Sequence, residues 1–461
     1  MFLEMSKKND SERGGWIYRG FRNYVIFINS LYYPKIYSIG VENLPKPGEP
    51  TLLVGNHQNC LNDPLNTEIV IKDRKPYCMV RSDVFKNKLF CTLLDGLGLL
   101  PVSRLGFEGK AAMAGNDKTF EVARRVLSEG KTLMLFPESG HQDKRWLGYF
   151  SLAYLKLAFE AAETAHFEKE IYIQPFAHHY EEYFHPRYDM MVQFGTPIAL
   201  SPYYAKYKEK PRTTIREVNA LVEKQIGDMM LNITDLDNYT AIDYLRSSEF
   251  GREYARKDGR NPNYVVDKLA SDKQLFAALE AAKAKAPEAM DNIYRNAREV
   301  DTETRRLGMR DWVLAKRPGM GNLMARLIVL LVTLPLFISG LALTWPVFLV
   351  PKFFHRLKIN GAIDPMFISS FNVGSMALVT FPLCCFIPAL VMLCCGNWLG
   401  AIGHVISFVL MVLFVIYYQR WFAKFRGVWN FHFADKKAIA ALTAKRDRLF
   451  NELKKHLYNI G

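Results

Sequence analysis

The motif GNHQNCLND, at residues 55–63, places a histidine and an aspartate where they could act as a proton-transfer pair. His57 and Asp63 are six positions apart, a spacing that does not bring two side chains together on one helix. We expect them to meet only if His57 lies on a loop after a strand and Asp63 lies on the helix that follows. A carboxylate bound to one imidazole nitrogen fixes the tautomer, so that the other nitrogen can take a proton.

Making an ester from an alcohol and a thioester requires a base for the hydroxyl proton and a group that orients the base. It also requires hydrogen-bond donors for the developing oxyanion. His57 and Asp63 can supply the first two of these functions. A histidine in a loop more often has a structural role, so the pair by itself is weak evidence of catalysis.

Short apolar runs alternate with helix-like segments around this motif. The run TLLVG precedes His57, and NDKTFEVARRVLSEGK has helical spacing and a glycine at its end. The other runs predicted to be strands are GLLPVSR, TLMLFPE, IYIQPFAHHY and MMVQFGTPI. Strands that alternate with helices predict an α/β domain over residues 41–205.

The flanking segments differ in character from this domain. Residues 1–40 carry aromatic rings among arginines and lysines, which is typical of an amphipathic helix in a membrane interface; a helix packed on a soluble core is the alternative. Residues 206–320 are charged and favour helices, and they contain no motif that indicates chemistry. We predict a helical extension there, and an amphipathic, basic helix over residues 431–461.

Long apolar runs are confined to residues 321–430, which predicts that this part is embedded in a membrane. Residues 366–395 and 399–418 are uncharged apart from one histidine, so we predict two transmembrane helices joined by a short link. Residues 327–350 have cations on both sides. Because the positive-inside rule keeps both ends on one side, we predict a re-entrant hairpin there, broken near Pro335, Gly340 or Pro346.

The charge balance supports a membrane partner. Lysine and arginine number 60 against 46 acidic residues, giving a net charge of +14. No block of consecutive basic residues and no RNA-binding or zinc-finger spacing is present, so we do not expect a nucleic-acid partner. Scattered cysteines and an N-terminus without an apolar signal segment predict an integral membrane protein whose catalytic domain lies on the cytoplasmic face.

Four sequence blocks together resemble the PlsC-type glycerolipid acyltransferases, a family that includes glycerol-3-phosphate and lysophosphatidic acid acyltransferases. The blocks are GNHQNCLNDPL, GLGLLPVSR, LMLFPESGHQDKR and IYIQPFAHHY, in this order, within residues 38–200. The resemblance implies an acyltransferase-type mixed sheet with flanking helices, to which the helical extension and the C-terminal membrane helices are added.

In this family the histidine and aspartate of the first block are the catalytic dyad, which implies these roles for His57 and Asp63. Five residues separate them here instead of the usual four. This variant is associated with the glycerol-3-phosphate and dihydroxyacetone-phosphate branch. The second block implies that Arg104 binds the acceptor phosphate, and a guanidinium can bind phosphate through two parallel hydrogen bonds.

The third block departs from the family pattern. Glu138 matches, but Ser139 replaces the usual glycine, and a Thr-Arg pair is missing. The resemblance implies that Glu138 fixes a loop or binds acceptor hydroxyls. Lys144 or Arg145 is expected to supply a second cation. Together with Gly140 and Ser139, these residues complete the predicted substrate-binding set.

The resemblance implies a membrane-bound O-acyltransferase of phospholipid synthesis. It would transfer a fatty acyl group from acyl-CoA or acyl-carrier-protein to glycerol-3-phosphate or lysophosphatidic acid, with membrane lipid as its surroundings. No cofactor is expected beyond the thioester co-substrate. His141, His178 and His179 lack the spacing of a zinc site, so no metal is expected either.

Two alternatives stay open at this point. The altered third block is compatible with a different lipid acceptor, such as an amino-acid lipid, a sphingoid base or a lyso-phospholipid. A non-catalytic lipid-binding membrane protein could also keep the fold, although it would not need a base and an orienting carboxylate together.

Overall fold

The computed structural model of the chain describes residues 15–81, 97–102, 116–138, 144–358 and 367–458. The chain divides into two compact units, each formed by two separate stretches of sequence. The first unit comprises Met1–Asn232 and Lys358–Ala377, and the second comprises Ile233–Leu357 and Leu378–Gly461.

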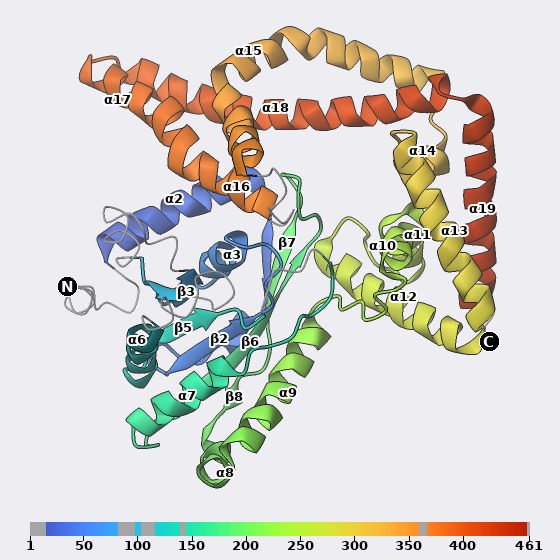
Figure 1. Cartoon of the computed structure of the whole chain (residues 1–461). Helices are drawn as coiled ribbons and strands as arrows, with labels where there is room; N and C mark the ends of the chain where they lie inside the picture. Colours follow the sequence, from blue (N-terminus) through green and yellow to red (C-terminus); the bar gives the residue numbers. More distant parts are fainter. Residues whose placement is uncertain (1–14, 82–96, 103–115, 139–143, 359–366, 459–461) are drawn as a thin grey trace. The chain divides into compact units, whose positions relative to one another are not determined.

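The first unit contains one mixed sheet with helices on both faces (Figure 1). Its strands are β1 (Ile36–Ile39), β2 (Thr51–Gly55), β3 (Tyr77–Arg81), β4 (Leu99–Val102), β5 (Thr132–Leu135), β6 (Tyr172–Tyr180), β7 (Met190–Phe194) and β8 (Ile198–Ala199). Its helices are α2 (Trp16–Tyr32), α3 (Asn62–Val70), α6 (Asn116–Ser128), α7 (Ala153–Thr164), α8 (Tyr204–Glu209), α9 (Pro211–Met229) and α16 (Phe367–Ser375), with short 3-10 turns at Val41–Asn43 and Ser201–Tyr203.

The sheet order is β1-β7-β6-β2-β5-β3-β4, and β8 pairs with β6. Strands β6, β2, β5, β3 and β4 run parallel to one another, whereas β7 is antiparallel to β6. The carboxyl ends of β2, β5 and β6 therefore meet at one edge in the middle of the sheet. In open sheets of this kind, ligands bind beyond the carboxyl ends of the strands.

The middle of the sheet is buried on both faces, which explains why TLLVG is a continuous apolar run. Leu52 and Val54 point into a core that they share with buried side chains of α6, α7 and α9. Helices α2 and α3 cover the opposite face (Figure 1). The predicted α/β fold with a mixed sheet and flanking helices is confirmed.

Segments on both sides of residues 41–205 belong to the first unit. Strand β1 pairs in parallel with β7, and α9 packs on β6. One face of α2 is buried, with Val25, Ile28 and Leu31 inside the unit. The guanidinium of Arg22 donates to the carbonyl oxygens of the last turn of α3, at 2.9 Å to the oxygen of Glu68. Helix α2 therefore packs on the domain.

The second unit is helical throughout its described residues. It contains α10 (Tyr239–Ser247), α11 (Glu249–Lys257), α12 (Val265–Lys285), α13 (Pro287–Arg306), α14 (Asp311–Lys316), most of α15 (Met320–Lys358), α17 (Ile387–Cys394), α18 (Trp398–Phe433) and α19 (Lys436–Tyr458). Two π-helical turns, Met376–Thr380 and Pro382–Phe386, join α16 to α17. The predicted helical extension and C-terminal apolar helices are confirmed as features of the fold.

Helix α15 is one continuous helix where the sequence predicts a hairpin broken within residues 327–350. It runs through Pro335, Pro346 and Pro351 and curves in Figure 1. Hydroxyl groups bind carbonyl oxygens near the prolines: Ser339 donates to the carbonyl of Pro335 at 3.0 Å. Within a membrane segment, such side-chain bonds and local adjustment allow a proline without a break.

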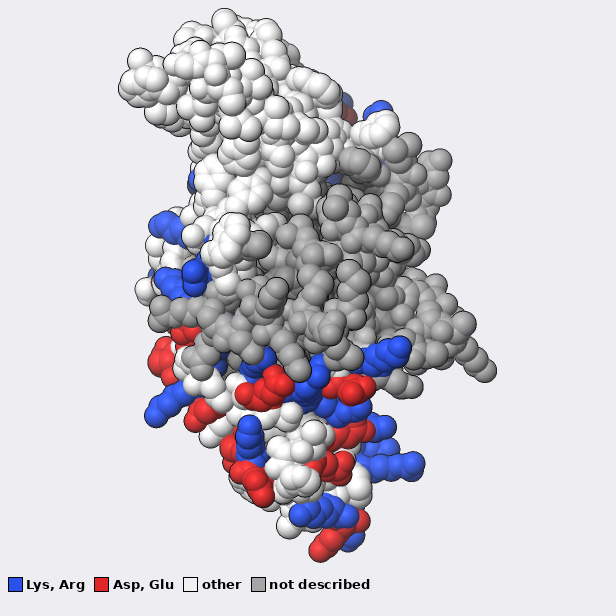
Figure 2. All heavy atoms as spheres, turned by 90° about the vertical axis from the view of Figure 1, so that its left-hand side faces the viewer, with Lys and Arg blue, Asp and Glu red and all other residues white. Residues whose placement is uncertain are grey.

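Among the described residues, three helical segments are long and apolar enough to cross a membrane: Met320–Phe353, Phe367–Cys394 and Trp398–Phe433. No Lys, Arg, Asp or Glu occurs between Phe367 and Gln419. In Figure 2 the top of the molecule, over α17 and the beginning of α18, is correspondingly free of charged atoms. Apolar side chains on these helices are exposed, so the protein associates with a membrane.

Gly55 ends β2 immediately before the loop that carries His57, and its position excludes any side chain. A Cβ atom there would lie 2.4 Å from the buried ring of Phe176 on β6. We predict that Gly55→Ala lowers the free energy of unfolding by about 1–3 kcal/mol, because the ring or the strand must move. The measurement is the thermal unfolding midpoint of the detergent-solubilised protein. Gly20→Ala on α2, where no atom lies within 4 Å, is the control and should lose no stability.

Candidate active site

His57 and Asp63 meet at the carboxyl end of β2. Nδ1 of His57 lies 2.8 Å from Oδ2 of Asp63. The side chain of His57 is 12% exposed and that of Asp63 is fully buried. As the spacing requires, His57 lies on the loop after β2 and Asp63 lies in the first turn of α3. The carboxylate accepts a hydrogen bond from Nδ1–H, so the lone pair of the neutral ring is on Nε2.

Both oxygens of Asp63 are used by protein donors. Besides His57, the backbone N–H groups of Gln58 and Asn59 donate to Oδ2, each at 2.8 Å. The hydroxyl of Tyr180, from β6, donates to Oδ1 at 2.7 Å. A buried charge is tolerated only with this kind of compensation. The carboxylate therefore fixes both the imidazole ring and the loop that carries it.

The electrostatics of the pair keep Asp63 ionised. Burial by itself would raise the pKa of Asp63, but the nearby His178 and the hydrogen bond and charge of His57 outweigh it and lower that pKa. Burial lowers the pKa of the fully buried His178, against the opposing effect of Asp63. Nδ1 of His178 lies 3.7 Å from Oδ1 of Asp63, and its Nε2 lies 2.8 Å from the hydroxyl of Thr67.

Phe136 and Glu138, which follow β5, also hold His57 in place. The ring of Phe136 stacks on the imidazole with centroids 4.6 Å apart. The carboxyl group of Glu138 accepts the N–H of His57 at 2.7 Å and the N–H of Gly148 at 3.0 Å. Burial raises the pKa of Glu138 to about 8, more than these two hydrogen bonds lower it. Glu138 is expected either to fix a loop or to bind acceptor hydroxyls, and these two hydrogen bonds fit the first role.

The loop between His57 and Asp63 is anchored at its start and turns sharply near its end. The side-chain oxygen of Asn56 accepts the N–H of His178 at 2.7 Å, and its nitrogen donates to the carbonyl of the same residue at 3.2 Å. Cys60 has a φ of 44°, in the left-handed region that non-glycine residues rarely adopt. Backbone strain of this kind is found at functional sites where the surroundings enforce it.

The remaining predicted substrate ligands have different outcomes. Arg104, Ser139 and Gly140 lie outside the described residues. Lys144 is partly buried next to the second of these gaps, and its substrate role stays a prediction. The buried guanidinium of Arg145 donates to the carbonyls at the end of β6, at 2.7 Å to that of Tyr180. This placement favours a structural role over the expected substrate contact.

Sequence reasoning missed the polar residues that surround Asp63. Tyr180 was not considered, and His178 was considered only as a metal ligand. Among the described residues, no group of three or more potential ligands is arranged for a metal ion. The unusual density of asparagine, with Asn59 in the loop and Asn62 and Asn66 on α3, was the available signal for a buried polar network.

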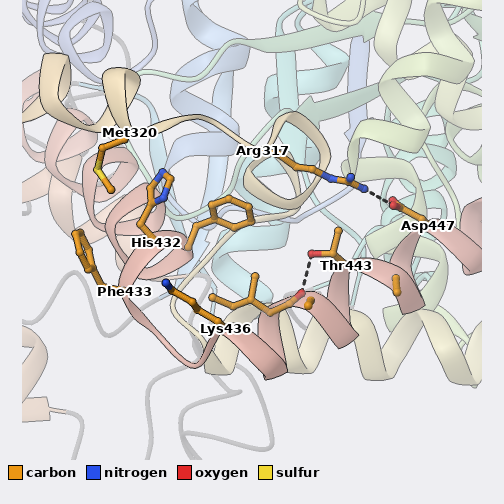
Figure 3. A pocket seen from close by; sticks show the side chains of 11 residues that line it. Arg317, Met320, His432, Phe433, Lys436, Thr443 and Asp447 are labelled. Carbon is orange, nitrogen blue, oxygen red and sulfur yellow. Dashed lines mark hydrogen bonds and ion pairs between the residues drawn. The ribbon is translucent and has the colours of Figure 1, made fainter.

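The second unit contains a cavity of about 720 Å³ that has no residue in common with this site. Figure 3 shows Met320 and Phe433, Arg317 with its partner Asp447, and Lys436 around it. These residues lie near the ends of the apolar helices α15 and α18 and on α19. Its one carboxylate, Asp447, pairs with Arg317, and none of the predicted catalytic residues lines the cavity.

Comparison with known proteins decides the family of the sheet domain. The family model described as Acyltransferase matches residues 35–179, which include the dyad, Glu138 and His178. Residues 35–179 are an acyltransferase-family domain. The predicted family resemblance is thereby confirmed for the residues that carry the site.

One solved structure is similar to part of this chain. The crystal structure of the 1-acyl-sn-glycerophosphate (LPA) acyltransferase PlsC from Thermotoga maritima is similar at 16% sequence identity and a TM-score of 0.34. The alignment covers 49% of this chain and 86% of that chain. The comparison with curated proteins found no match.

The low pKa of His178 predicts a specific acid sensitivity of the acyltransferase domain. The unfolded chain binds a proton at this histidine near the ordinary value of 6.5, whereas the folded protein resists protonation. Stability from this residue is therefore complete above pH 6.5 and is lost as the pH falls toward its lower folded pKa. Between pH 6.5 and 4, we expect the thermal midpoint of His178→Gln to fall less steeply than that of the wild-type protein. This range lies above 3.8, the ordinary pKa of an aspartate such as Asp63.

The control for this titration is His166→Gln, because His166 is an exposed residue of the same unit. This variant should show the same pH dependence as the wild-type protein. Equal slopes in all three proteins would contradict the assignment of the acid sensitivity to His178.

Proposed function

We propose that the protein is a membrane-bound O-acyltransferase of phospholipid synthesis. It transfers a fatty acyl group from acyl-CoA or acyl-carrier-protein to the hydroxyl of glycerol-3-phosphate or lysophosphatidic acid. The observation that carries the proposal is the 2.8 Å contact between Nδ1 of His57 and Oδ2 of Asp63 within an acyltransferase-family domain.

The chemistry of the transfer follows from the tautomer of His57. Nε2 takes the proton of the acceptor hydroxyl as the oxygen attacks the carbonyl carbon of the thioester. Asp63 stabilises the imidazolium that forms. When the tetrahedral intermediate collapses, the C–S bond breaks, and the imidazolium returns the proton to the leaving thiolate. The products are the ester and the free thiol, and neither redox chemistry nor a cofactor is required.

The acceptor is proposed to bind through its phosphate. Arg104 is the proposed phosphate ligand and Lys144 a proposed second cation, with Ser139 and Gly140 shaping the loop between Glu138 and Lys144. Glu138 supports this loop indirectly, because its carboxyl group ties the backbone of His57 to that of Gly148. A guanidinium is the group best suited to grip a phosphate, which favours a phosphorylated acceptor over a neutral lipid.

The location of the site fits a lipid product. Helix α16, the beginning of the second apolar segment, packs in the same unit as the dyad. An acceptor with one acyl chain, or a newly formed lipid, would thus be handled beside the membrane. Lysines and arginines flank the apolar segments, and we propose that the acyltransferase domain faces the cytoplasm.

The test is an acyl-transfer assay with labelled acyl-CoA and the purified full-length protein in detergent. Glycerol-3-phosphate, lysophosphatidic acid and a neutral lysolipid are supplied in separate reactions. We expect product from a phosphorylated acceptor, and a loss of at least about 10³-fold in kcat for His57→Ala.

His185→Ala removes an exposed histidine from the same unit and should keep the wild-type rate. Product from the neutral acceptor alone would overturn the proposed substrate class. Equal rates for His57→Ala and His185→Ala would overturn the proposed mechanism.

A further inference from the structure

Helix α16 carries polar side chains that are buried, although it begins an apolar segment of 28 residues. Ser369 is fully buried and Ser370 is 6% exposed. A polar group at the border of a membrane segment is costly unless it is hydrogen-bonded inside the protein. The hydrogen-bond partners of these two serines therefore identify the part of the protein that this end of the segment contacts.

Both serines bind the catalytic loop. The hydroxyl of Ser370 donates to the backbone carbonyl of Asn59 at 2.9 Å. The hydroxyl of Ser369 donates to the side-chain oxygen of Asn59 and accepts from the side-chain nitrogen of Asn62, the latter at 3.2 Å. Asn59 is the residue whose N–H donates to Oδ2 of Asp63 at 2.8 Å. Two hydrogen bonds in series thus connect α16 with the carboxylate of the dyad.

Further contacts hold α16 in this place. The hydroxyl of Tyr24 on α2 donates to the carbonyl of Ala377, just beyond α16, at 2.6 Å. A Cβ atom at Gly374 would lie in ordinary van der Waals contact, at 3.8 Å, with the side chain of Leu61 in the loop between His57 and Asp63. The hydroxyl of Tyr33 accepts hydrogen bonds from the side-chain nitrogens of both Asn59 and Asn62, which completes the network.

We infer that the beginning of the second apolar segment is a positioning element of the active site, in which Ser369 and Ser370 hold Asn59 so that the loop presents His57 to its substrates. This inference rests on the proposed function, since it assigns a role in the same transfer reaction. The family domain of residues 35–179 does not contain α16. The catalytic loop therefore takes part of its geometry from a segment about 310 positions further along the chain.

The first test is kinetic and uses the full-length, detergent-solubilised protein. The double variant Ser369→Ala/Ser370→Ala loses both links to Asn59, and we expect kcat to fall roughly ten- to hundredfold, because small misplacements of catalytic groups have effects of this size. The KM values for donor and acceptor should stay within about twofold of wild type, since both serines are buried. Ser375→Ala is the matched control: its hydroxyl bonds to the carbonyl of Asn372 within α16.

The second test does not depend on activity. Cys60 lies next to Asn59 and is buried, so loosening of the loop should speed its modification by a maleimide, measured peptide by peptide with mass spectrometry. Cys78, buried in β3, reports on general unfolding. We expect faster labelling of Cys60 but not of Cys78 in the double variant, and wild-type rates in Ser375→Ala.

The outcomes separate the inference from the proposed function. Wild-type kcat together with wild-type labelling of Cys60 in the double variant would overturn the positioning role. If the wild-type protein transfers no acyl group, the proposed function fails, and the labelling of Cys60 alone decides whether α16 holds the loop. If Cys78 also labels faster, the single variants decide: Ser370→Ala should lower kcat, and Ser370→Thr, which keeps the hydroxyl, should restore it.

Discussion

A buried carboxylate is the feature around which the acyltransferase domain is arranged. Asp63 is removed from water, and its charge is stable there because one imidazole, two backbone N–H groups and one phenol donate to it. Each donor can reach Asp63 only when the part of the structure that carries it has folded. The loop after β2 supplies three donors and β6 supplies Tyr180, so the sheet order determines whether the site can form.

The same carboxylate connects the chemistry with the membrane-associated part of the chain. Asn59 donates to Asp63 through its backbone and contacts α16 through its side chain and its carbonyl oxygen. Glu138 closes the arrangement from β5 by binding the backbone of His57.

Much of this arrangement could be predicted from the sequence, because local patterns encode it. The runs that form β2, β4, β5, β6 and β7 were predicted as strands, and the approach of His57 to Asp63 follows from a strand–loop–helix sequence. Strands β1 and β3 were missed, because each lies next to aromatic or charged residues without a clear period of two. The contacts of Tyr180 and of α16 with the loop could not be predicted, since they depend on long-range packing that no local pattern encodes.

The central claim is that the ionised carboxyl group of Asp63 orients His57 for proton transfer. The most direct test is the kcat of Asp63→Asn, in which an amide NH₂ must face one of the donors and the tautomer of His57 is no longer fixed. The account predicts a loss of about 10⁴-fold in kcat with little change in KM for the acyl donor, in a protein that still unfolds cooperatively. An Asp63→Asn variant that folds and keeps more than about a tenth of the wild-type kcat would contradict it.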